Sequence, residues 1–234
     1  MTAPSATADK IIETIRAALA PHGLFLRGTV NFASGEAAPL LVDGRPATSV
    51  VLIGNIGGSL WQPFDAWRRS RPDRGGADPL DRWSKAILQP LADELWATAY
   101  FPSDPPWQPF QQWAMRAERL KPSPLGILIH PRHGLWHGYR GALAFDIPLG
   151  RTGEAATEHP CDGCSAKPCI SACPARALAG ERFDVTLCRS HLRADAGRAA
   201  CLANGCLSRD ACPIGASHRY PPEQLSFHMA ALEV

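Results

Sequence analysis

The stretches CDGCSAKPCISACP at residues 161–174 and CLANGCLSRDACP at residues 201–213 decide how this chain is interpreted. Together with Cys188 between them, they hold all eight cysteines of the 234 residues. Pro174 directly follows the fourth cysteine, and Pro213 directly follows the last. Groups of cysteines that close in Cys-Pro are typical of segments that bind two iron–sulfur clusters. The pattern therefore predicts two [4Fe–4S] clusters in a ferredoxin-like module.

The order of the cysteines also predicts which of them share a cluster. In two-cluster ferredoxins, the cysteine before proline binds the neighbouring cluster. We therefore predict two ligand sets: Cys161, Cys164, Cys169 and Cys212 for the first cluster, and Cys173, Cys188, Cys201 and Cys206 for the second. Two four-coordinate clusters use all eight cysteines. Four residues instead of the common two separate Cys164 from Cys169, so the pairing and the cluster type stay open.

Zinc and disulfides are the alternatives for these cysteines. Structural zinc usually takes paired Cys-x-x-Cys knuckles, and Cys161 with Cys164 forms the single knuckle here. Disulfides need an oxidising compartment, and the first residues do not resemble a secretory signal. Reduced thiols without a signal predict a cytoplasmic protein.

Composition limits the classes of partner. The chain is 45% hydrophobic and 20% charged, as globular proteins are, and its net charge is +2. This near-neutral balance favours neither a nucleic-acid surface nor an anionic membrane surface. No apolar stretch approaches the ~20 residues of a membrane span. We therefore expect no nucleic-acid partner and no membrane partner.

The distribution of residue types predicts two domains. All seven tryptophans lie at or before Trp136, whereas the cysteines begin at Cys161. We place an α+β substrate or cofactor domain at residues 1–155 and the two-cluster domain, with a C-terminal tail, at residues 156–234.

Hydrophobic patterns predict alternating strands and helices in the first domain. The expected strands are Ala47–Ile53, Ala97–Phe101, Gly126–His130 and Gly141–Ile147. The expected helices are Asp9–Ala20, Ser59–Arg69, Pro79–Leu95 and Phe110–Leu120, with Asp9 and Ser59 as N-caps.

Two groups outside the cysteines are candidate cofactor contacts. Gly54, Gly57 and Gly58 link an expected strand to a helix, where backbone amides can bind an anion. A tight turn explains the same glycines equally. His130 and His133 are candidates for a cofactor contact or proton transfer, although loop histidines commonly only form hydrogen bonds.

Asp104 is the candidate catalytic residue. It lies just beyond an expected strand and before Pro105. Carboxylates in such positions often point into a ligand crevice, although Asp-Pro also commonly begins a turn.

Two further stretches carry a family resemblance. Together with the eight cysteines, GILIHPRHGLW at residues 126–136 and GALAFDIPL at residues 141–149 resemble epoxyqueuosine reductases and, more distantly, reductive dehalogenases. These families contain two [4Fe–4S] clusters and depend on a corrinoid. The resemblance implies a nitroreductase-like N-terminal domain, cobalamin as a second cofactor, and Asp104 as general acid.

Three functions are therefore open. The first is a reductase that passes single electrons through two clusters to a pocket in the N-terminal domain. It would act with or on a corrinoid or another small-molecule substrate, and would take electrons from a low-potential donor protein. The second is a ferredoxin-like electron carrier without catalysis of its own, and the third is a zinc-stapled binding module.

Overall fold

The computed structural model of the chain describes residues 4–153, 156–179 and 182–232. These residues form two compact units. Residues 4–119 and 138–153 make up the first unit, and residues 120–137 and 156–232 make up the second. The segment 120–137 thus belongs with the cysteines. The predicted domain boundary after residue 155 stays a prediction, because compact units are not evidence of independent folding.

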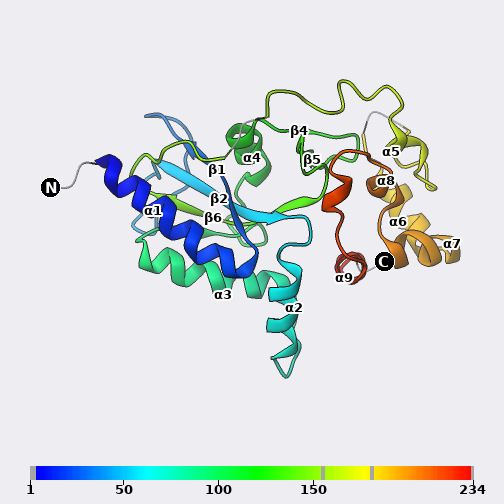
Figure 1. Cartoon of the computed structure of the whole chain (residues 1–234), viewed down its shortest axis with the longest axis horizontal. Coiled ribbons are helices and arrows are strands. Elements are labelled where there is room, and N and C mark those ends of the chain that lie inside the picture. Colours follow the sequence, from blue (N-terminus) through cyan, green and yellow to red (C-terminus); the bar gives the residue numbers. More distant parts are fainter. Residues whose placement is uncertain (1–3, 154–155, 180–181, 233–234) are drawn as a thin grey trace. The chain divides into compact units, whose positions relative to one another are not determined.

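A four-stranded sheet forms the centre of the first unit, in the order β1-β2-β6-β3 (Figure 1). Its strands are β1 (Phe25–Asn31), β2 (Ser49–Ile56), β3 (Thr98–Tyr100) and β6 (His137–Phe145). β1 pairs antiparallel with β2, and β3 pairs antiparallel with β6. The apolar run Val50–Ile53, in which all residues but Leu52 are β-branched, is fully buried in β2, as its composition predicts for an interior strand.

β1 is the strand that the hydrophobic pattern did not predict. Its register against β2 shifts between Leu26 and Gly28, so a bulge interrupts the two-residue alternation of a regular strand. In addition, its polar residues Arg27 and Thr29 are buried. A strand that is irregular and buries polar side chains lacks the pattern by which strands are recognised.

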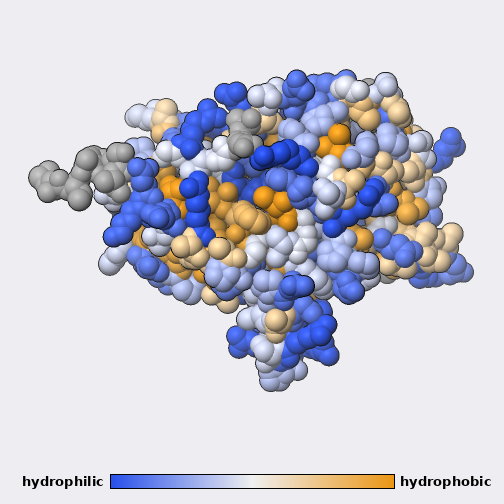
Figure 2. All heavy atoms as spheres, viewed as in Figure 1, coloured by the Kyte–Doolittle hydropathy of each residue, from blue (hydrophilic) through white to orange (hydrophobic). Residues whose placement is uncertain are grey.

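The helices of the first unit are α1 (Pro4–Leu19), η1 (Ala20–His22), α2 (Trp61–Arg69), α3 (Pro79–Glu94) and α4 (Phe110–Glu118). α1 and α3 lie along one face of the sheet and α4 lies on the other (Figure 1). The end of α2 and the turn after it are hydrophilic (Figure 2), and Arg69, Arg71 and Arg74 are exposed there. The predicted helices are present, but Asp9 and Ser59 are not their N-caps, since α1 begins at Pro4 and the N-cap of α2 is Leu60.

A buried ion pair joins β1 to α4. Nε and Nη2 of Arg27 donate to Oε1 of Glu118 over 3.2 and 2.9 Å, and Nη1 donates to the carbonyl of Asn55 over 3.0 Å. The hydroxyl of Tyr139 donates to the other oxygen of Glu118. Burial, followed by the charge of Glu118, raises the pKa of Tyr139, so this hydroxyl keeps its proton. The charges of Arg27 and Glu118 are thus paired and hydrogen-bonded, as burial requires.

The second unit contains a small two-stranded sheet and short helices. Its strands are β4 (Lys121–Pro122) and β5 (Leu128–Ile129). Its helices are α5 (Pro168–Ser171), α6 (Val185–Arg193), α7 (Asp195–Gly197), η2 (Arg198–Leu202), α8 (Leu207–Asp210), η3 (Ala216–His218) and α9 (Pro222–Ala230). Asp184 begins α6 as its N-cap and accepts a hydrogen bond from the amide of Leu187 over 2.9 Å.

The predicted fold class is wrong in its second part. The α+β character of the first unit agrees with the sheet and helices observed, but the second unit is not ferredoxin-like. From residue 156 on, the described residues form helices and turns and no strand. Nor do any three His, Cys, Asp or Glu side chains in the described part of the chain form a ligand group for a metal ion. The physical reason is local: Pro168 and Pro222 stand at the first positions of α5 and α9, and Asp184 caps α6, so these segments begin helices rather than strands.

In residues 4–153, 156–179 and 182–232, none of the helices is both long and apolar enough to cross a bilayer.

The buried ion pair gives a prediction about stability. Glu118→Gln should lower the free energy of unfolding by about 3–5 kcal/mol, because it leaves the charge of Arg27 buried without a counter-charge. Asp73→Asn is the control, because it removes an exposed partner of Arg82 and should leave the denaturation midpoint unchanged. Urea denaturation followed by circular dichroism measures both variants. Equal midpoints for Glu118→Gln and the wild type would contradict the interpretation.

Candidate metal centre

The first predicted ligand set is gathered in the second unit. We call Cys161, Cys164, Cys169 and Cys212 the first quartet. Burial, followed by the charges of Cys212, Cys169 and Cys164, raises the pKa of the Cys161 thiol to about 11. Charges interact in this way only at short range. Cys212 also packs into a small apolar cluster with Ile129 and Leu135, and Cys161 contacts the same cluster.

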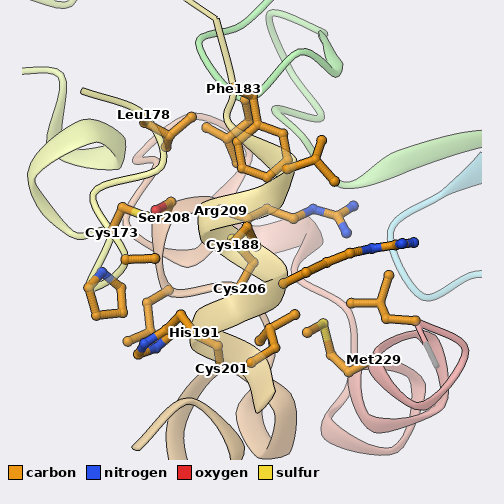
Figure 3. Close-up of a pocket in the computed structure, with 18 of the residues that line it drawn as sticks. Cys173, Leu178, Phe183, Cys188, His191, Cys201, Cys206, Ser208, Arg209 and Met229 are labelled. Carbon is orange, nitrogen blue, oxygen red and sulfur yellow. The ribbon is translucent and has the colours of Figure 1, made fainter. Parts of the chain in front are cut away.

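The second predicted ligand set surrounds a cavity. We call Cys173, Cys188, Cys201 and Cys206 the second quartet. All four line one cavity of about 300 Å³ (Figure 3). Burial raises the pKa of the Cys188 thiol, and the charges of Cys206, Cys173 and Cys201 add to the rise. The structure thus brings together the same four cysteines that the sequence order assigned to one cluster.

The wall of this cavity is mainly apolar. It includes Leu178, Phe183, Leu192 and Met229 together with residues from the segment 120–137. Polar groups are placed among them, namely Arg189, His191, Ser208 and Arg209. Such a wall keeps water from whatever the thiols bind, and water exclusion is one of the factors that set the potential of a metal cluster.

The spacing of the thiols bears on what they can bind. One ion binds all its ligands directly, and no such group exists among the described residues. A cubane cluster instead binds each thiolate through a different iron, so its four ligands stand farther apart. This larger group is the one that the sequence predicts for the two quartets. Whether they bind it stays a prediction.

The predicted histidines lie together in the second unit. The rings of His130 and His133 are stacked with their centroids 4.1 Å apart. Nδ1 of His130 accepts hydrogen bonds from the amides of Arg132 and His133, which places it as a turn-forming residue. Nδ1 of His133 lies 3.3 Å from Nε2 of His218. Their role as cofactor contacts stays a prediction.

Asp104 and the glycines lie in the first unit. Nζ of Lys85 is 2.6 Å from Oδ1 of Asp104, in an ion pair that is partly exposed. Gly54 lies where β2 and β6 approach so closely that a Cβ atom would stand 2.0 Å from the carbonyl oxygen of Gly138. Gly57 has a φ of 54° in the turn before α2. Close packing and turn geometry thus account for these two glycines, and anion binding by them is untested.

By sequence, this chain matches no protein-family model and no curated protein. Among solved structures, the C. elegans B12-trafficking protein CblC, described as a human MMACHC homologue, matches with a TM-score of 0.56. The match covers 96% of this chain and 92% of CblC.

The chain is similar in fold to CblC. The sequences are only 14% identical, so the likeness concerns the fold alone. Since it covers nearly the whole chain, it also replaces the ferredoxin-like description of the residues that carry the cysteines.

Arg209 is a residue of this site that the sequence did not reveal. Its guanidinium carbon lies 4.4 Å from the centre of the Trp136 ring and 4.6 Å from that of Tyr220. Its Nη2 donates to the carbonyl of Leu135 over 2.6 Å. Arg209 thereby joins α8 to the segment 120–137 while it lines the cavity of the second quartet. Its partners are 11 to 74 residues away in sequence, and no local pattern relates them.

Stacking of this kind requires the planar guanidinium group. Arg209→Lys should therefore lower the free energy of unfolding by about 1–2 kcal/mol. Arg189→Lys is the matched control, because Arg189 lines the same cavity but is exposed and should tolerate the change. Thermal and chemical denaturation measure the two variants, and equal stability of both would show that the stacking contributes nothing.

Proposed function

We propose that this chain is an iron–sulfur redox protein, related to epoxyqueuosine reductases and reductive dehalogenases, that supplies single electrons to a corrinoid. The observation that carries the proposal is the sorting of all eight cysteines into two quartets with none left over. Each quartet would hold one [4Fe–4S] cluster through four thiolates. When bound, such clusters supply one-electron transfer at low potential.

The fit of the second quartet to such a cluster is supported by its surroundings. Four thiols line a cavity of about 300 Å³ whose wall is mainly apolar. Leu178 and Leu192 are buried there and help to exclude water. Cysteine thiolates are the usual ligands of iron–sulfur clusters, whereas the alternative zinc module requires four ligands that converge on one ion.

The corrinoid is supported by two independent observations. One is the resemblance of the stretches 126–136 and 141–149 to corrinoid-dependent reductases. The other is the likeness in fold to a protein described as a B12-trafficking protein. We therefore propose a corrinoid, or a small molecule bound with it, as the substrate. Clusters of low potential in turn require a low-potential donor protein as partner.

Asp104 is the proposed proton donor. Lys85 holds one of its carboxylate oxygens at 2.6 Å. This contact orients the side chain and leaves it partly accessible. To act as donor, Asp104 would take up a proton from Lys85 or from water and pass it to the substrate while that substrate is reduced.

Anaerobic reconstitution with iron and sulfide tests the proposal. We expect about eight irons and eight sulfides per chain. Hydroxocobalamin added to the same preparation should show a shifted absorption spectrum. Full clusters without a cobalamin shift would favour the electron carrier, and zinc in place of iron would overturn the redox function.

Cys188→Ala tests the assignment of ligands within this experiment. It should halve the iron content, to about four per chain, because it removes one ligand of the second quartet only. Ser190→Ala, an exposed change on the same helix, is the control and should retain full iron. Full iron in Cys188→Ala would show that the second quartet is not a cluster site.

Asp104→Asn tests the proton donor. The variant should keep its iron and its cobalamin spectrum but lose at least 100-fold in the rate of substrate reduction, the lower range for loss of a general acid. Asp93→Asn is the control, because Asp93 is an exposed carboxylate of α3 that should not affect turnover. An unchanged rate in Asp104→Asn would exclude the role of Asp104.

A further inference from the structure

His191 brings a ring nitrogen to the wall of the cavity that the second quartet lines. It lies on α6, three residues after Cys188. Side chains three residues apart on a helix lie on the same face. Both side chains accordingly line the cavity, and Figure 3 shows them there.

The Nε2 atom of His191 is buried, and it has no hydrogen-bond partner within the part of the chain that the structure describes. Nearly all buried polar groups in proteins are hydrogen-bonded, so such an exception points to an ion or group that the site binds. Nε of Arg209 is likewise buried and has no hydrogen-bond partner among the described residues, although Nη2 of Arg209 donates to the carbonyl of Leu135. Two nitrogen atoms that can donate therefore line one cavity without acceptors.

Sulfur is the acceptor that this cavity supplies. Most of its lining side chains are apolar, while its four cysteines provide thiolates and a bound cluster provides sulfides. Hydrogen bonds to these sulfurs stabilise the more negative, reduced form of a cluster. They are one of the means by which proteins raise cluster potentials.

We propose that His191 donates a hydrogen bond from Nε2 to a sulfur of the cluster in the second quartet, and so raises the reduction potential of that cluster. This inference rests on the proposed function, since it requires the cluster. His191 is not a ligand: the four thiols complete the coordination, and the imidazole acts on the sulfur atoms around the iron.

Redox titration of the reconstituted protein tests the inference. Each cluster takes up one electron from dithionite in the presence of viologen mediators, and absorption and electron paramagnetic resonance follow the two steps. In His191→Leu, the equilibrium constant for reduction of one cluster should fall about tenfold. This corresponds to a reduction potential lower by about 59 mV for a one-electron couple. His191→Gln keeps an N–H donor and should restore most of the difference. Ser190→Ala should move neither step.

The titration separates this inference from the proposed function. Cys161→Ala, which should keep a cluster only in the second quartet, identifies the step that His191 must affect. His191→Phe repeats the measurement without a donor if the leucine variant fails to fold. Full iron and sulfide with both steps unmoved would overturn the inference alone. A wild-type protein that takes up no iron would overturn the inference together with the proposed function.

Discussion

The gathering of eight thiols into two quartets is the constraint on which the second unit depends. Ionised thiols repel one another, and the raised pKa values of Cys161 and Cys188 record both this repulsion and burial. A metal cluster, if the proposed one is bound, would replace this repulsion by bonds, because it binds thiols in their ionised form. Cluster binding and folding would then be coupled, as they are in small metal-binding domains.

The short helices of the second unit depend for their stability on contacts with other parts of that unit. α5 and α8 have four residues each and α7 has three. Helices of this length are not stable in isolation, because nucleation fixes several residues before hydrogen bonds repay the loss of entropy. Their stability must come from tertiary contacts such as the stacking of Arg209 between Trp136 and Tyr220. Cysteines on α5 and α6, and on the turns that flank α8, would add covalent links through a cluster.

The sequence predicted the regular elements of the first unit because their patterns are local. The apolar run of β2 and the helix that begins at Pro79 need no knowledge of the rest of the chain. β1 was missed because a bulge interrupts its alternation and because it buries Arg27. Burial of this charge is possible only because Arg27 pairs with Glu118, which is 91 residues away. The ferredoxin-like fold was predicted wrongly because cysteine order is a property of ligands, and different backbones can present the same ligands.

The grouping of the candidate ligands came from cysteine order, whereas their surroundings could not be predicted. The rule that the cysteine before proline binds the neighbouring cluster assigned Cys212 to the first quartet and Cys173 to the second, and this pairing stays a prediction. The helical spacing of Cys188 and His191 was also present in the sequence, but it has no meaning until α6 is known to border a cavity. The environment of Asp104 required the structure, because Lys85 lies on α3, a different element.

The fold and the cysteines bear on the function in different ways. A likeness in fold at 14% identity cannot carry a function by itself, because one fold serves many functions. Cysteine quartets by themselves cannot name a substrate, since electron carriers and reductases contain the same clusters. The proposed corrinoid reductase therefore needs a bound corrinoid in addition to the clusters, whereas an electron carrier needs the clusters alone.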